Sequence, residues 1–213
     1  MPYIKDVAGL WSRGDDPRHV RDLSAGRHQR RHRIVSAAVT LAADGYDAVQ
    51  LRLVAEDAGV STSTIYHYFS SKDDLLVACF HRWIVANDLA IRAELAPIAD
   101  PTERLRRVIY RMTESLCAAT PFAQAVCRAY LCADHTAAAN TDHVREALSM
   151  VFSGLDRSDI SPRLQQDIGS LFGDCWVINA LSVIHGRATV AELQDRLART
   201  AADLMTSRLS PTT

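Results

Sequence analysis

Apolar residues recur along this chain at intervals of three and four positions, the spacing that places them on one face of an α-helix. Proline and glycine stand at most boundaries between the apolar segments. The pattern predicts helices over residues 26–44, 50–58, 61–69, 71–95, 100–119, from 120 onward, from about 140 onward, 161–186 and 189–209. No strand-like alternation of useful length occurs, so an all-α fold is expected.

Residue types that favour helix starts support these boundaries. Asp100–Glu103 combines an N-cap aspartate, a proline at the first helical position and an acid in the first turn. Thr189 with Glu192 fits a capping box, and so does Ser71 with Asp74. The long helix that follows Ser71 should therefore join the N-terminal part of the chain to the rest without a flexible linker.

The stretch over residues 48–72, AVQLRLVAEDAGVSTSTIYHYFSSK, predicts a helix-turn-helix with its motif at about 50–69. Gly59 suits the tight turn, and Ser61 is the expected N-cap of the second helix. That helix buries Val60, Ile65, Tyr68 and Phe69 and exposes Ser61, Thr62, Ser63, Thr64, Tyr66 and His67. Short hydroxyl side chains without an acid allow a helix to lie close to base edges and phosphates. A plain helical hairpin inside a bundle is the alternative.

Basic residues flank this stretch. Residues 26–33 read GRHQRRHR, and Arg27, Arg30 and Arg31 are expected to neutralise DNA phosphates, or to enter a minor groove as part of an arm. The alternative is a solvated first helical turn, although cations are disfavoured at a helix N-terminus. Gln50, Arg52 and Lys72 complete the expected DNA contacts, with Lys72 placed for a phosphate in the first turn of its helix.

These residues carry a family resemblance. Gly59-Val60-Ser61, Thr64-Ile65-Tyr66, His67-Tyr68-Phe69, Lys72 and Leu75, with Arg52, Val54-Ala55 and Ala58 before them, resemble the DNA-binding domain of TetR-type transcriptional regulators over roughly residues 27–80. The position before Leu51 is often Thr in that family and is Gln50 here. Residues 45–50 and 121–123, with Arg128-Ala129, are similar to actinobacterial regulators of steroid catabolism. The resemblance implies a homodimer that binds double-stranded operator DNA under the control of a small molecule.

Composition agrees with a soluble regulator and excludes other classes. The chain has 213 residues, 48% of them hydrophobic, and a formal net charge of −1, so it is not basic as a whole. Five irregularly spaced cysteines, no secretory signal and no run of 18 apolar residues indicate a reduced, cytoplasmic protein without a membrane span. No nucleophile elbow, P-loop, dinucleotide fingerprint or metal-binding spacing occurs, so no enzyme activity, cofactor or metal is expected.

We expect three parts: a mobile arm over residues 1–23, a DNA-binding domain over 24–72 and a ligand-binding and dimerisation domain over 73–209. Residues 171–184 are apolar almost all round their helix and therefore require cover on every side. The last helix adds Val190, Leu193, Leu197 and Leu204 at near-heptad spacing. Residues 163–209 of two chains should thus form a four-helix interface; burial of both helices within one chain is the alternative.

The middle helices predict an effector site. Its expected wall is apolar with two amides: Trp83, Asn87, Met112, Phe122, Phe152, Trp176 and Asn179. For a single aromatic residue, core packing is the more frequent role, and for a single buried Asn a hydrogen-bonded place in the core. Such a wall suits a large, mostly hydrophobic molecule, and the resemblance adds a steroid or fatty acyl intermediate or its coenzyme A thioester. The predicted function is a repressor released by this effector; an activator, a co-repressor-dependent regulator, or an all-α lipid carrier or enzyme are alternatives.

Overall fold

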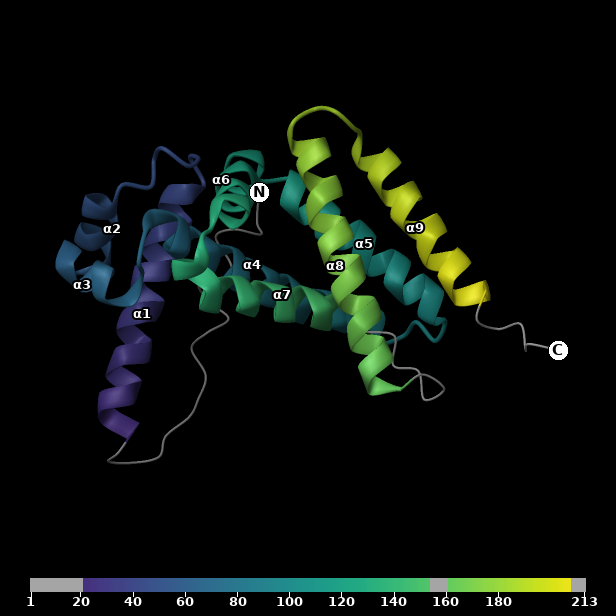
Figure 1. Ribbon diagram of the computed structural model, residues 1–213, viewed down its shortest axis with the longest axis horizontal. Helices are drawn as coiled ribbons and strands as arrows, with labels where there is room; N and C mark the ends of the chain where they lie inside the picture. Colours follow the sequence, from purple (N-terminus) through teal and green to yellow (C-terminus); the bar gives the residue numbers. More distant parts are fainter. Residues whose placement is uncertain (1–20, 154–160, 208–213) are drawn as a thin grey trace.

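The computed structural model describes residues 21–153 and 161–207, and in these ranges the chain consists of α-helices and one short 3-10 helix (Figure 1). The elements are α1 (Arg21–Ala42), α2 (Leu51–Ala58), α3 (Thr62–Tyr68), α4 (Lys72–Leu95), α5 (Pro101–Cys117), α6 (Thr120–Cys132), η2 (His135–Ala137), α7 (Ala138–Phe152), α8 (Pro162–Ile184) and α9 (Val190–Ser207). The all-α prediction is confirmed. The predicted arm lies outside the described residues up to position 20.

Helix α1 begins at Arg21, so the first helix starts five residues earlier than the predicted start at residue 26. The arginines at 27–33 therefore lie beyond the first turn, where the partial positive charge of a helix N-terminus has faded. The helix ends as predicted: Gly45 has a φ of +102° and its N–H donates to the carbonyl of Ala42 over 2.9 Å.

The helix-turn-helix forms where the local signals place it. Gly59 ends α2 in the left-handed conformation at a φ of +63°. Ser61 caps α3, its Oγ accepting from the backbone N–H of Thr64 at 3.1 Å. Ile65 and Phe69 then turn their side chains into a core shared with α1 and α2. The opposite face of α3 remains open to solvent.

Helix α4 runs through the centre of the molecule and belongs to both domains (Figure 1). Every residue from 74 to 80 is buried, because α1, α6 and α7 surround this segment. Ser71 caps the helix by accepting from the N–H of Asp74 at 3.0 Å, as predicted. The Asp74 carboxylate accepts from Ser70, one residue before the N-cap, so the capping box is displaced by one position.

The C-terminal domain is a bundle of α5–α9 around the second half of α4 (Figure 1). Asp100, Ser161 and the Thr189–Glu192 pair cap α5, α8 and α9 as predicted. Helices α7 and α8 approach at backbone distance: a Cβ at Gly169 would collide with the Ser149 carbonyl oxygen. This contact holds the two helices in a fixed relation.

Helix α9 lies against α5, and this corrects the expected dimer seam. Leu193 and Leu197 are buried inside their own chain, 2% and 4% exposed. Their near-heptad spacing is satisfied by an intramolecular partner, which periodicity alone cannot distinguish from a second chain. The side chain of Leu204 and the predicted helix end at Leu209 lie outside the part of the chain that the structure describes.

Helix α8 keeps an uncovered apolar stripe. Leu171, Cys175 and Ile178 point outward at helical spacing, and Leu171 and Ile178 are 57% and 59% exposed. The helix is long and apolar enough to cross a membrane, with a mean hydropathy of 1.3, as is also common in core helices of water-soluble proteins. Its other face, which includes Phe172 and Trp176, is buried in this chain.

Candidate nucleic-acid interface and effector core

The exposed face of α3 is rich in hydroxyl groups and free of carboxylates. Thr62, Ser63 and His67 are exposed, and the Tyr66 side chain is 58% exposed although it is a large aromatic. This solvent-facing Tyr in the middle of a short helix is not part of the buried core. Its ring and hydroxyl are therefore available to a partner.

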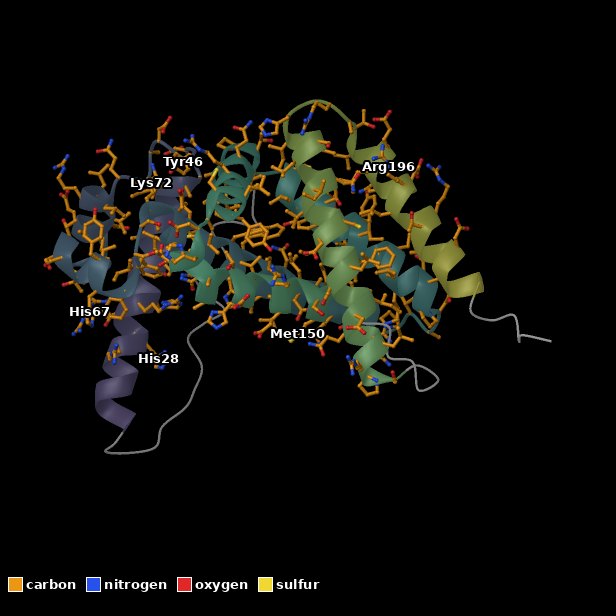
Figure 2. All side chains as sticks on the ribbon, in the orientation of Figure 1. His28, Tyr46, His67, Lys72, Met150 and Arg196 are labelled. Carbon is orange, nitrogen blue, oxygen red and sulfur yellow. The ribbon has the colours of Figure 1, made fainter. Side chains whose placement is uncertain are left out.

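A shallow groove of about 660 Å³ separates α3 from the N-terminal half of α1. Its lining combines two cations with hydroxyl and imidazole groups: Arg27, Arg30, Ser63, Thr64, His67 and Tyr68. His28 and His67 project on the same side of the domain (Figure 2). The arginines and the helix face thus form one surface, as the sequence predicted for Arg27 and Arg30. Guanidinium and hydroxyl donors converging on a groove suit the oxygens of a phosphate.

Ser61 and Gln50 occupy the two N-cap positions of the motif. The Ser61 hydroxyl is engaged by its own helix, within 2.8 Å of the hydroxyls of Ser63 and Thr64. It is therefore first a capping residue. The Gln50 side chain makes no capping hydrogen bond and is exposed. Arg52, on the first turn of α2, is also exposed.

Arg31 faces away from the groove, contrary to its expected role beside Arg30. Its Nη2 donates to Oδ1 of Asn140 on α7 at 2.8 Å, and its guanidinium lies over the Phe69 ring at 5.2 Å. One residue turns a helix by about 100°, so adjacent arginines face different neighbours. Arg31 thus links the first domain to the second.

Lys72 is half-buried and is also turned inward. Its Nζ lies 3.8 Å from the ring centroid of Tyr46, and Arg128 of α6 lies 4.0 Å from the same centroid. The Tyr46 hydroxyl donates to Asp73 at 2.7 Å. Burial, followed by that hydrogen bond, raises the pKa of Tyr46 to about 12, and burial lowers the pKa of Lys72. Figure 2 shows Tyr46 and Lys72 side by side. The structure therefore gives Lys72 a cation–π contact with Tyr46, whereas the sequence predicted a side chain placed for a DNA phosphate.

The aromatic residues predicted as an effector wall come together in the C-terminal domain. Trp83 of α4 stacks on Trp176 of α8 with centroids 6.4 Å apart and planes at 8°, and Phe152 of α7 follows at 5.8 Å from Trp176. Trp176 is fully buried, and its Nε1 donates to Oγ1 of Thr113 on α5 at 3.0 Å. Met112 and Phe122 are buried in the same core, whereas Trp83 is half-buried at its edge.

The two asparagines expected in this wall do not line it. The Asn87 amide donates to the Trp83 carbonyl of its own helix at 2.9 Å. Asn179 lies at the edge of α8, where its amide donates to the Cys175 carbonyl at 2.7 Å and accepts from Arg196 of α9 at 3.0 Å. The expected amide pair is therefore absent from the core, and Thr113 is the polar side chain that replaces it.

Sequence reasoning missed Asn140 and did not anticipate the burial of Asp74; the two are 8% and 5% exposed between the domains. The available signal was periodicity, because Asn140 stands on the same helical face as the buried Val144 and Leu148. A polar residue on a buried face requires a partner. Among the described residues, no group of three or more His, Cys, Asp or Glu side chains is arranged to hold a metal ion.

Comparison with known proteins agrees with this architecture. Residues 34–79 match the family "Bacterial regulatory proteins, tetR family", and residues 99–204 match "Tetracyclin repressor-like, C-terminal domain". The HTH-type transcriptional repressor KstR of Rhodococcus jostii is 32% identical over 179 residues, covering 83% of each chain. KstR of Mycobacterium tuberculosis is 30% identical over 175 residues, 82% of this chain and 80% of the relative.

Solved structures share the fold. A TetR transcriptional regulator from Rhodococcus sp. RHA1 superposes with a TM-score of 0.73 at 24% identity, covering 87% of this chain and all of the other, 100%. The Thermus thermophilus FadR repressor, solved with lauroyl-CoA, gives a TM-score of 0.65 at 21% identity, covering 86% and 98%. Both KstR relatives are named as transcriptional repressors and not as enzymes. The chain therefore belongs to the TetR family of bacterial regulatory proteins.

Proposed function

We propose that this protein is a homodimeric transcriptional repressor that holds an operator through α3 and α1 and is released by a hydrophobic effector. Residues 24–72 bind DNA, and residues 73–209 bind the effector and dimerise. The observation that carries the DNA-binding assignment is the open α3 face, whose hydroxyl groups adjoin the groove lined by Arg27 and Arg30.

On DNA, α3 enters the major groove with Tyr66 and the hydroxyl residues toward the bases. Arg27 and Arg30 contact the phosphates beside it, and Gln50 and Arg52 are exposed at the start of α2 for the adjoining backbone. Lys72 and Arg31 act differently from these contacts. They hold the domain in place through Tyr46 and Asn140 and are not counted among the phosphate ligands.

The second protomer covers the outer stripe of α8. Leu171, Cys175 and Ile178 form the apolar stripe. Only 39% of an apolar 18-residue stretch of this helix is buried within one chain. In a dimer with two-fold symmetry, the stripe of one protomer packs against the same stripe of its partner. The dimer can then engage two half-sites about 34–36 Å apart, one turn of duplex.

The effector belongs to the class of large, mostly apolar molecules, with a fatty acyl or steroid coenzyme A thioester as the leading candidate. The core around Trp176 offers the rings of Phe80, Phe152 and Trp176 and the Thr113 hydroxyl, with the ring of Trp83 at its edge. An apolar chain that enters beside Trp83 would separate the Trp83–Trp176 stack and displace α4. The fatty acyl thioester seen with the Thermus relative supports this class.

The test begins with selection of bound duplexes from a random pool, which yields the operator. A fluorescent operator complex is then titrated with lauroyl-CoA and a steroid coenzyme A thioester, with coenzyme A alone as the control. We expect thioesters to lower the anisotropy and coenzyme A alone to leave it unchanged. Release by a sugar phosphate or a cationic drug, with no response to either thioester, would contradict the effector class while leaving DNA binding intact.

Engagement of the aromatic core has its own signal. Trp83 and Trp176 are two of the three tryptophans, so an apolar ligand that separates their rings changes the intrinsic fluorescence. Replacing Trp83 with Ala should weaken the response to the thioester while preserving operator affinity. Equal responses in the variant and the wild type would place the effector elsewhere.

A further inference from the structure

A chain of hydrogen bonds joins α1, α7 and α4 in the interior of the molecule. Arg31 donates to Oδ1 of Asn140 at 2.8 Å, and Nδ2 of the same amide donates to Oδ1 of Asp74. The other oxygen of Asp74 accepts from the N–H of Ser70 at 2.8 Å and from its hydroxyl at 3.1 Å. Asp74 and Asn140 are only 5% and 8% exposed, so solvent cannot replace these partners.

The central position of this chain requires an amide. The side chain at 140 must accept from a guanidinium and donate to a carboxylate at the same time, which an Asn can do and an alkyl or acidic side chain cannot. A buried carboxylate without donors is costly, and so is a buried guanidinium without an acceptor. Asn140 therefore satisfies Arg31 and Asp74 together, although they lie on different helices.

Each end of the chain reaches the DNA-binding unit. The guanidinium of Arg31 lies over the ring of Phe69, the C-cap of α3, which is the recognition helix of the motif. Ser70 and Asp74 form the junction between that helix and α4, and the Ser70 hydroxyl is 3.0 Å from the hydroxyl of Thr136 just before α7. Two direct contacts, Asn140–Asp74 and Thr136–Ser70, thus attach the start of α7 to the segment that follows α3, and Arg31 adds an indirect one between Asn140 and Phe69.

The other end of α7 is attached to the helix with the uncovered apolar stripe. Gly169 and Gly173 of α8 allow the backbones of α7 and α8 to approach so closely that a Cβ at either position would collide with α7. Figure 1 shows α7 beside α4, reaching from the region of α1 to α8. Helix α7, packed along α4, is therefore a rigid connection between α8 and the segment that follows the recognition helix.

We propose that Asn140 is a positioning residue: it fixes the recognition helix against α7 and thereby sets the separation of the two recognition helices in the dimer. This inference rests on the proposed dimerisation through α8. When both half-sites are bound, the second contact is intramolecular, and its strength depends on how well the second helix is held at the required position. Loss of the Asn140 hydrogen bonds widens the range of positions that the recognition helix can occupy and weakens the simultaneous binding of both half-sites.

The test compares the full palindromic operator with a duplex that carries a single half-site. Asn140→Ala should bind the palindrome about tenfold more weakly, the loss that follows when buried charged hydrogen bonds are left unmade. Its affinity for the single half-site should remain within twofold, because the α3 face and the groove with Arg30 are untouched. Asn140→Ala should also tolerate palindromes with one base pair added between the half-sites better than the wild type does.

An exchange of the two side chains provides the rescue. Asn140→Asp alone places two carboxylates together and should lose palindrome affinity like Asn140→Ala. In the double variant Asp74→Asn with Asn140→Asp, the carboxylate faces Arg31 and the new amide donates to it, so palindrome affinity should return to within about threefold of wild type. This double variant keeps the test decisive even if Asn140→Ala does not fold.

Two results would overturn the inference: equal losses on the palindrome and the half-site, which indicate damage to the motif itself, or a double variant no better than Asn140→Asp. Failure of the proposed dimer is recognised separately, from wild-type protein that binds palindrome and half-site with equal affinity and sediments as a monomer on DNA. That outcome removes the basis of this inference as well.

Discussion

Arg30 and Arg31 are adjacent in α1 and provide a matched pair for testing which surface meets DNA. Arg30 is exposed and lines the groove beside α3, whereas Arg31 is half-buried and bonded to Asn140. Replacing either with Gln removes one positive charge from neighbouring positions of α1. If net charge alone governed binding, the two variants would behave alike. The structure predicts that they differ in how their affinity depends on salt.

The magnitude follows from counterion release. Each phosphate contact contributes a slope of about −0.9 to the logarithm of affinity against the logarithm of salt concentration. A symmetric dimer loses two contacts when Arg30 is replaced, so the slope should become shallower by about 1.8. Over a fourfold rise in salt, the wild type should thus lose about twelvefold more affinity than Arg30→Gln. Arg31→Gln should weaken operator binding with the wild-type slope, because it removes an internal contact.

The assay is anisotropy of a labelled operator at a series of sodium chloride concentrations from about 50 to 200 mM, the range in which this effect is large. Circular dichroism of both variants controls for folding. The interpretation is refuted if Arg31→Gln flattens the slope by the amount expected for two contacts while Arg30→Gln keeps the wild-type slope. Equal slopes in all three proteins would show that neither arginine meets a phosphate.

Three other predictions concern the dimer face, pH and thiol reactivity. Ile178→Asp should yield folded monomers in sedimentation. It should weaken the dimer by at least about 3 kcal/mol, because two apolar side chains leave the interface. Leu193 is buried within its own chain, so Leu193→Asp should instead lower the thermal midpoint of unfolding. Burial and neighbouring cations lower the pKa of His81 below its ordinary value of 6.5. As the pH falls, this imidazole is therefore protonated in the unfolded chain before it is protonated in the folded protein. The free energy of unfolding, measured in urea, should therefore be highest above that value and fall as pH drops through it toward the folded pKa; an equally steep fall in His81→Gln would contradict this. Iodoacetamide should modify Cys132 in both wild type and Ile178→Asp but Cys175 only in the monomer; fast labelling of Cys175 in the wild-type dimer would exclude the α8 face as the interface.

Much of the architecture was predictable because its signals are local. Gly59 adopts the positive φ that its place between two helices requires, and Ser61 caps the helix that follows it. Asp100 and the Thr189–Glu192 pair form the hydrogen bonds that their spacing indicates. Such contacts span only a few residues, so the chain contains all that is needed to infer them.

The aromatic core proposed to take the effector was predicted in part for a related reason. Aromatic residues on apolar helix faces are buried wherever the helices meet, so the grouping of Trp83, Phe152 and Trp176 follows from amphipathic pattern and fold. The polar members were misplaced, because a small rotation about the helix axis decides whether an amide faces the core or its edge. Asn179 lies three positions after the buried Trp176 and meets Arg196 instead.

The sequence by itself determined the all-α class, the helix-turn-helix, the hydroxyl face of α3 and the continuity of α4, since each depends on periodicity and on contacts within a few residues. Only the tertiary structure decided which of two adjacent arginines lines the groove and which meets Asn140, 109 positions away. It likewise decided that Leu193 packs within its own chain while Ile178 faces outward. Periodicity identifies an apolar or polar face; the partner of that face depends on the packing of distant helices, which no local pattern encodes.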